Sequence, residues 1–125
     1  MRALSKRVAA LFIVLLAGML LSAPTVGAKA PPKAKYDCVI GSILFGTLTV
    51  KSGKHYAHRG TRGKFTAGKK RIPFPDKIKG WRLKFKGGSL RGFKGRWYRT
   101  TTPGVSEIAL KNPRDGFESI YCTQR

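Results

Sequence analysis

The chain has 125 residues and a formal net charge of +21, from 26 lysines and arginines against five aspartates and glutamates. This length allows one small domain, and this charge makes binding to polyanions physically favourable. The five acids are scattered without paired spacing, which argues against an enzyme that works with two carboxylates.

The N-terminal segment, residues 1–28, has the three parts of a secretory signal peptide. Residues 1–7 hold three cations and no acid, residues 8–21 form an apolar run of 14 residues, and the small-residue sequence SAPTVGA ends at Ala28. Fourteen helical residues would span about 21 Å, short of a bilayer core of about 30 Å, so a membrane anchor fits poorly. We predict cleavage after Ala28 and a secreted, periplasmic or otherwise extracytoplasmic protein.

The mature part of 97 residues keeps 23 of the cations and all five acids. Residues 29–35 are rich in proline and lysine and are predicted to be a flexible lead-in. A single β domain is predicted over residues 36–125.

Short strands follow one another through this domain, because apolar and polar residues alternate over brief runs separated by glycine-rich turns. The clearest is WRLKFK at 81–86, followed by a Gly87-Gly88 turn. Residues 71–75 are extended, but their prolines exclude them from a central strand. An all-β antiparallel meander of seven or eight strands is predicted, as a barrel or curled sheet. The strands are expected at 36–40, 44–50, 54–58, 64–66, 81–86, 94–101, 107–110 and 119–122.

Both cysteines lie in the mature part, Cys38 near its start and Cys122 near its end. An even number of cysteines in an exported chain predicts a disulfide, and the CxxC pattern of a redox couple is absent. A bridge that closes about 85 residues would stabilise the fold by roughly 4 kcal/mol. It would also place the first and last strands side by side.

Several motifs of the C-terminal two-thirds of the mature chain stand in a recognisable order. They are GKF at 63–65, RIPF at 71–74, FKGGSLRGFKGRWY at 85–98, SEIAL at 106–110 and YC at 121–122. This order resembles small exported bacterial all-β domains, which have Gly-x-Tyr/Phe, Phe-x-Gly-Gly-x-Leu-x-Gly-x-x-Gly-x-Trp/Tyr, Ile-x-Leu and a C-terminal cysteine paired with one near the start. Those domains share a fold rather than an agreed activity. The resemblance therefore implies the β architecture but no reaction, and the heavy cation load departs from the pattern.

No catalytic, metal-binding or cofactor site is predicted. His55 and His58 are the only histidines, and at positions i and i+3 of a strand they face opposite sides. No nearby acid or free cysteine would complete a metal site, so we expect a surface pair beside Tyr56. The serines lack the context of a nucleophile turn, and glycine-rich nucleotide-binding patterns are absent.

Cations concentrate in residues 68–99, which hold twelve lysines and arginines against one acid. On the strand at 81–86 three of them face one side at intervals of about 6.6 Å, comparable with phosphates along a nucleic-acid strand. Cations after the glycine turn would extend this stripe, whereas Lys111 and the lysines of 29–35 are expected to lie elsewhere. The predicted polyanion-binding residues are Arg82, Lys84, Lys86, Arg91, Lys94, Arg96 and Arg99.

Aromatic residues stand between these cations, and two interpretations of them stay open. They could stack on nucleic-acid bases beside a basic groove, or they could form the hydrophobic core of a domain this small. The core is favoured for Trp81 and Phe85. The residues concerned are Trp81, Phe85, Phe93, Trp97 and Tyr98.

We therefore expect an exported, basic, non-catalytic binding module. Its expected partners are anionic polymers or surfaces found outside the cytoplasm, namely envelope polysaccharide, lipopolysaccharide, teichoic acid or extracellular nucleic acid. One alternative is a small secreted effector or inhibitor that binds a protein partner or a membrane through the loops at 53–63 or 72–79. Another is a structural domain without a dedicated ligand, whose cations form a solvated face.

Overall fold

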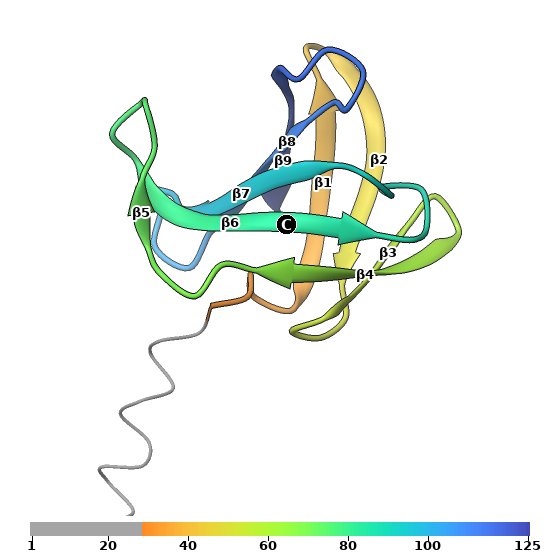
Figure 1. The fold of residues 1–125 in the computed structure, drawn as a ribbon, viewed down its shortest axis with the longest axis horizontal. Helices are drawn as coiled ribbons and strands as arrows, with labels where there is room; N and C mark the ends of the chain where they lie inside the picture. The colour runs from red at the N-terminus through yellow and green to blue at the C-terminus, as the bar shows by residue number, and fades with distance from the viewer. Residues whose placement is uncertain (1–28) are drawn as a thin grey trace, which may run out of the picture.

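The computed structural model describes residues 29–125, so the predicted signal peptide at 1–28 lies outside the described residues. Regular structure in this part consists of strands, and none of its residues forms a helix that is long and apolar enough to cross a bilayer. The strands (Figure 1) are β1 (Ala34–Ile40), β2 (Ile43–Val50), β3 (His55–His58), β4 (Thr61–Ala67), β5 (Ile72–Pro73), β6 (Lys79–Lys86), β7 (Lys94–Arg99), β8 (Ser106–Lys111) and β9 (Glu118–Gln124).

Eight of these strands close into an antiparallel up-and-down barrel. Each barrel strand pairs with the next barrel strand along the chain, so that β4 pairs directly with β6 and β5 is skipped. The last strand, β9, pairs with β1. The two-residue strand β5 forms a hairpin with the start of β6. The predicted all-β antiparallel meander is confirmed, and closure pairs the edges that an open sheet would leave exposed.

Alternation along the strands fills the inside of the barrel with apolar side chains. On β6, for example, Leu83 and Phe85 are buried, while Lys84 and Lys86 are exposed on the outer face. The same period of two on the other strands adds the rest of the core, which includes Tyr36, Leu48, Val50, Tyr56, Phe65, Trp97, Ile108, Leu110 and Ile120.

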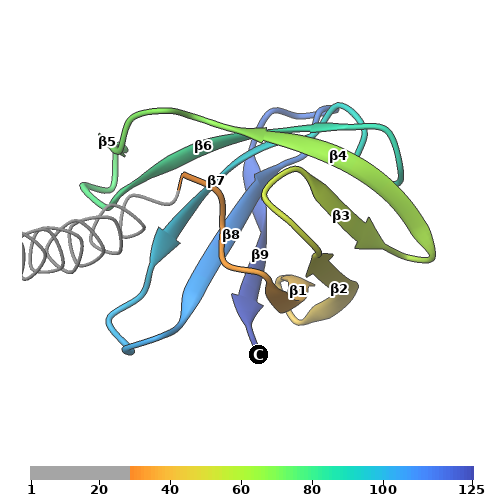
Figure 2. The same cartoon turned by 90° about the horizontal axis from the view of Figure 1, so that it is seen from below.

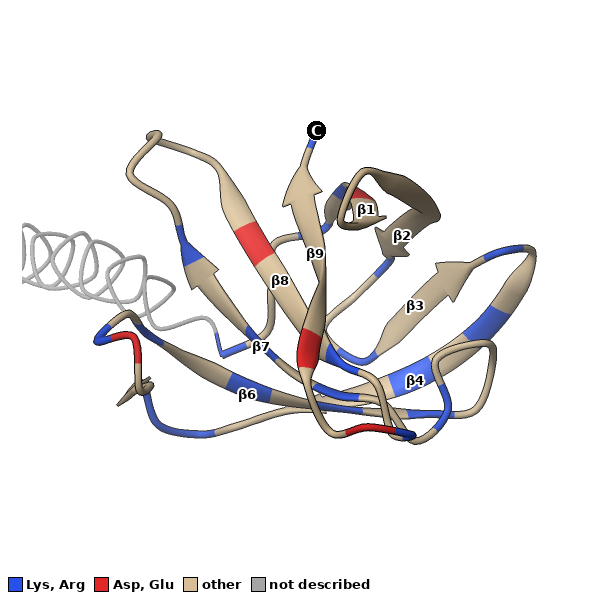
Figure 3. Ribbon diagram, turned by 90° about the horizontal axis from the view of Figure 1, so that it is seen from above, with Lys and Arg blue, Asp and Glu red and all other residues tan. Residues whose placement is uncertain are grey.

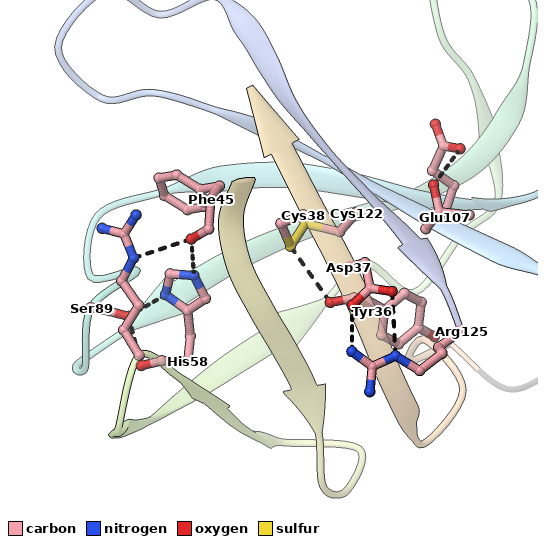
Figure 4. Close-up of a disulfide and its surroundings, with 11 residues drawn as sticks. Tyr36, Asp37, Cys38, Phe45, His58, Ser89, Glu107, Cys122 and Arg125 are labelled. Atoms are coloured by element: carbon pink, nitrogen blue, oxygen red, sulfur yellow. Dashed lines mark hydrogen bonds and ion pairs between the residues drawn. A yellow bond between two sulfur atoms is a disulfide. The ribbon is translucent and has the colours of Figure 1, made fainter. Parts of the chain in front are cut away.

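The disulfide between Cys38 and Cys122 belongs to this core and joins β1 to β9. The two residues are partners across the paired strands, and both are fully buried (Figure 4). The predicted pairing is confirmed. A buried structural disulfide fits an oxidising, extracytoplasmic environment.

The lead-in before β1 packs against one end of the barrel, in contrast to the flexible segment expected from its composition. The carbonyl of Lys29 accepts a hydrogen bond of 2.9 Å from Trp97 Nε1, and the carbonyl of Pro32 accepts one of 2.8 Å from the Tyr36 hydroxyl. Pro31 is buried between these contacts. Figure 2 follows this segment, in orange, into β1. Composition does not reveal such packing, because backbone carbonyls and a proline ring make the contacts.

The loop between β6 and β7 folds over the other end of the barrel. Leu90 of this loop is fully buried, and its N–H donates to the hydroxyl of Tyr56, which in turn donates to the carbonyl of Gly87. Gly63 makes this closure possible, because a Cβ at that position would lie 2.5 Å from the Gly87 oxygen. A glycine is needed where β4 and the loop approach this closely.

Candidate anion-binding groove

All five acidic side chains form hydrogen bonds or ion pairs within residues 29–125, whereas most of the basic side chains there have no acidic partner. Two of the 23 cations in residues 29–125 have a carboxylate within 4 Å, and the other 21 have none among the described residues. Figure 3 shows lysine and arginine distributed over the strands and the loops, with few acids between them. The bonds that engage the acids are Asp76 and Glu118 with Arg96, Asp37 with Arg125, Glu107 with the Tyr98 hydroxyl and Asp115 with the Phe117 N–H.

Arg96 on β7 holds two carboxylates at once. Its Nε and Nη2 donate to Glu118 at 2.9 and 2.7 Å, and its Nη1 and Nη2 donate to Asp76 at 2.9 and 2.6 Å. The Arg96 side chain is only 8% exposed, although it points to the outer face of the barrel. Charge-assisted, two-pronged pairs of this kind are strong and fix geometry. Arg96 therefore fastens β9 and the β5–β6 hairpin to the outer face of β7.

Two aromatic rings complete the surroundings of this guanidinium. Its central carbon lies 4.9 Å from the ring centroids of both Phe74 and Tyr98, within cation–π range. The hydrogen bonds from Arg96 hold the pKa of Asp76 below its ordinary value, and the bond to Glu118 raises the pKa of Arg96 itself. The sequence pattern places Arg96 in a solvated stripe of cations, whereas in the structure its guanidinium forms ion pairs with two carboxylates.

Three lysines lie in a single row across the outer face. Lys84 on β6 is the partner of Lys94 on β7, and Lys94 is the partner of Lys111 on β8. All three are exposed. Like charges directly opposite one another on neighbouring strands destabilise a sheet. This lysine row concentrates positive potential at a cost to the fold.

A groove of about 740 Å³ runs over the lysine row, between the outer face of the strands and the β5–β6 hairpin. Five of its lining residues are cations and two are carboxylates, and both carboxylates are held by Arg96. Its net charge is therefore positive, with aromatic surface alongside. The residues that line and define this basic groove are Phe74, Pro75, Asp76, Arg82, Leu83, Lys84, Lys94, Gly95, Arg96, Tyr98, Lys111, Glu118 and Tyr121.

The structure brings four of the seven predicted polyanion-binding residues to this groove. Lys86 is exposed further along β6, beside Lys64 of β4. Arg91, in the β6–β7 loop, and Arg99, at the end of β7, are also exposed and do not line the groove. The four that do are Arg82, Lys84, Lys94 and Arg96.

Lys111 belongs to the groove, although sequence reasoning expects it elsewhere. It reaches the lysine row because β8 pairs with β7, which sets Lys111 opposite Lys94. A meander places consecutive strands side by side, so matching the outward positions of neighbouring strands could have found it. That match requires the strand register, which the sequence pattern alone does not give.

None of the five aromatics between the predicted cations offers a free ring for base stacking. Phe85 and Trp97 lie in the core, and Trp81 stacks on Trp97 with ring centroids 4.4 Å apart. Phe93 packs partly buried against the core, and Tyr98 is buried on the outer face, where burial and its bond to Glu107 raise its pKa. For these five aromatic residues, the structure therefore supports packing within the protein rather than stacking on nucleic-acid bases.

His58 is buried, so the expected surface pair of histidines is wrong for this residue. Its Nδ1 lies 2.6 Å from Ser89 Oγ, and its Nε2 lies 3.0 Å from the carbonyl oxygen of Phe45 (Figure 4). The Phe45 ring stacks on the imidazole at 5.0 Å, and desolvation lowers the His58 pKa. A serine beside a histidine can be a nucleophile and its base, but here the histidine is oriented by a neutral carbonyl rather than a carboxylate. The contacts join β2, β3 and the β6–β7 loop, which is a structural role.

Comparisons with protein-family models, with curated proteins and with solved structures gave no match. Within residues 29–125, no three histidine, cysteine or acidic side chains are grouped as metal ligands. Fold and groove together describe a closed, disulfide-linked β-barrel with a basic outer groove.

Proposed function

We propose that the protein is exported and acts as a non-catalytic module that binds anionic polymers or anionic envelope surfaces through the basic groove. The observation that supports this most directly is the row of Lys84, Lys94 and Lys111. Mutually repelling lysines have no benefit for an isolated sheet, so an anionic ligand gives their alignment a reason. The described carboxylates near the groove are bound to Arg96 and cannot neutralise the row.

The geometry favours a ligand that presents repeated charges rather than bases. Neighbouring strands lie about 4.8 Å apart, so the lysine row offers three ammonium groups at close intervals. The five aromatic rings between residues 81 and 98 are buried or packed, and Tyr121, which lines the groove, is 38% exposed. Binding is therefore expected to depend on phosphate, sulfate or carboxylate groups and to be strongly sensitive to salt. Envelope polysaccharide, lipopolysaccharide, teichoic acid and extracellular nucleic acid all meet this description.

A salt titration tests the proposal. The affinity for heparin and for single-stranded DNA is measured over a range of salt concentrations for the wild type and for the triple variant Lys84→Gln/Lys94→Gln/Lys111→Gln. With single-stranded DNA, each phosphate that a cation neutralises adds about 0.7 to the steepness of the log–log slope. The groove triple should therefore flatten the slope by about 2.

The matched control removes the same charge from a distant surface, as Lys33→Gln/Lys51→Gln/Lys54→Gln, all exposed and outside the groove. This control should weaken binding several-fold less than the groove triple. Equal reductions in affinity in the two triples would show that only net charge matters and would refute a groove site.

A further inference from the structure

The barrel end that carries the β1–β2 hairpin exposes an apolar cluster. Ile43 and Leu44 are 70% and 68% exposed, and because successive strand residues point to opposite faces, neither face of the hairpin is covered there. Phe117 in the β8–β9 loop is 69% exposed, and Ile40 is 38% exposed. We call Ile40, Ile43, Leu44 and Phe117 the apolar tip.

The two segments of the apolar tip come together because β1 pairs with β9. Ile40 is the partner of Ile120, and Phe117 stands three residues before Ile120. Figure 1 shows the β1–β2 hairpin and the β8–β9 loop reaching the same side of the molecule. Clustered apolar residues at a loop-bearing end mark an interaction surface rather than the scattered exposure of an ordinary protein surface.

Arginines share the barrel end that carries this apolar tip. In an antiparallel barrel the turns that follow β1, β3, β6 and β8 lie at the same end, and three of them hold an exposed arginine: Arg59, Arg91 and Arg114. The guanidinium of Arg59 lies 4.6 Å from the ring of Phe45, the residue after Leu44. In these four described connections Asp115 is the only acid.

Exposed aliphatic and aromatic side chains with arginines at the same barrel end match one partner chemistry, the interface of an anionic bilayer. Its acyl boundary accepts apolar groups, and its phosphates attract cations, each strengthening binding about fivefold near the surface. A soluble polyanion offers no apolar phase for Ile43, Leu44 or Phe117. We propose that the apolar tip inserts into the headgroup region of an anionic membrane, with the three arginines against the lipid phosphates. This inference does not rest on the basic groove.

The first experiment measures co-sedimentation with vesicles of equimolar phosphatidylglycerol and phosphatidylcholine, and with vesicles of phosphatidylcholine alone. The wild type should prefer the anionic vesicles and keep part of its binding at high salt. Ile43→Ser/Leu44→Ser should lower that salt-resistant binding at least about tenfold, because the variant lacks two aliphatic side chains that would be buried in the membrane. Ile78→Ser removes a 40% exposed side chain from the opposite barrel end and should change binding less than about twofold.

A second measurement reports insertion directly. In Phe117→Trp, a new indole stands at the tip, whereas Trp81 and Trp97 are stacked together at the other end of the barrel. On anionic vesicles its emission should shift to the blue and be quenched by brominated lipid. Binding without quenching, absence of vesicle binding by the wild type, or equal binding of the wild type and the Ile43/Leu44 variant would each overturn the inference. So would a dimer in solution that the Ile43/Leu44 variant abolishes while vesicle binding is absent.

The groove triple and the tip variant separate this inference from the proposed function. Lys84→Gln/Lys94→Gln/Lys111→Gln should bind heparin more weakly and keep the salt-resistant vesicle binding. Ile43→Ser/Leu44→Ser should do the reverse. If the tip variant leaves vesicle binding intact while the groove triple removes it, the groove alone contacts lipid and the insertion is refuted.

Discussion

Replacement of Arg96 by glutamine measures how much the outer face depends on one guanidinium. The variant lacks four charge-assisted hydrogen bonds to Asp76 and Glu118 and the packing against two aromatic rings. Breaking a fully buried pair costs about 3–5 kcal/mol. Asp76 and Glu118 are 39% and 20% exposed and can regain water, so we expect the free energy of unfolding to fall by about 2–3 kcal/mol.

Thermal unfolding gives the readout. For a domain of this size, the destabilisation should lower the Tm by roughly 10–20 °C. The control is Arg125→Gln, which breaks the ion pair with Asp37. That pair has the same 2.7 Å length as the Arg96–Glu118 pair, but its side chains are 57% and 46% exposed, so the Tm should change by less than about 3 °C. Equal Tm shifts in the two variants would refute the argument that burial makes the ion pairs of Arg96 more stabilising than that of Arg125.

Amide exchange tests the same variant locally. Arg96 is the residue that bonds Asp76 of the β5–β6 hairpin to the outer face of the barrel. Exchange in this hairpin should therefore accelerate more than exchange in the β1–β2 hairpin. Uniform acceleration over both hairpins would mean that Arg96 stabilises the fold as a whole and does not specifically hold the β5–β6 hairpin over the groove.

Three further changes follow from the fold. Cys38→Ala/Cys122→Ala should lower the free energy of unfolding by about 4 kcal/mol in denaturant titrations, and thiol titration of the denatured, unreduced wild type should find no free sulfhydryl. Burial lowers the His58 pKa, so as pH falls the unfolded chain takes up a proton at a higher pH than the folded chain does, and stability should decline below about pH 6.5. His58→Asn should remove this decline. An identical pH profile in the variant would assign the decline to other groups. Gly63→Ala places a Cβ 2.5 Å from a backbone oxygen and should destabilise by about 2 kcal/mol, while Gly53→Ala, whose Cβ would meet an atom at 3.8 Å, should be close to neutral in the same denaturant titration.

The fold was largely predictable because its determinants are local. A period of two in WRLKFK at 81–86, glycine turns and two cysteines are properties of short segments, and they predict the strands and the pairing of Cys38 with Cys122. The structure places β6 at Lys79–Lys86 and joins the two cysteines. The sequence pattern does not distinguish a closed barrel from a curled sheet, since closure depends on the β4–β6 pairing around β5, which no local pattern encodes.

The groove was only partly predictable because it depends on register and on long-range pairs. Alternation on one strand identifies Lys84 as outward, but the partnership of Lys94 with Lys111 appears only when strands are aligned. The role of Arg96 depends on Asp76 and Glu118, which are 20 and 22 residues away in the chain. His58 illustrates the same limit, because its partners Ser89 and Phe45 are 31 and 13 residues away. Counting charges along a segment cannot separate a bonded cation from a free one.

The lysine row yields a prediction in which function and stability oppose each other. If Lys84, Lys94 and Lys111 are aligned for an anionic ligand, they repel one another in its absence, and their replacement by glutamine should raise the Tm by a few degrees at low salt. The Debye length falls from about 10 Å at 0.1 M salt to about 3 Å at 1 M, so the gain should shrink as salt increases toward 1 M. Heparin should stabilise the wild type more than the triple variant, because a ligand that binds only the folded state raises its stability. A triple variant with a lower Tm at low salt would show that the lysines support the barrel itself, and the row would then give no reason to infer a ligand.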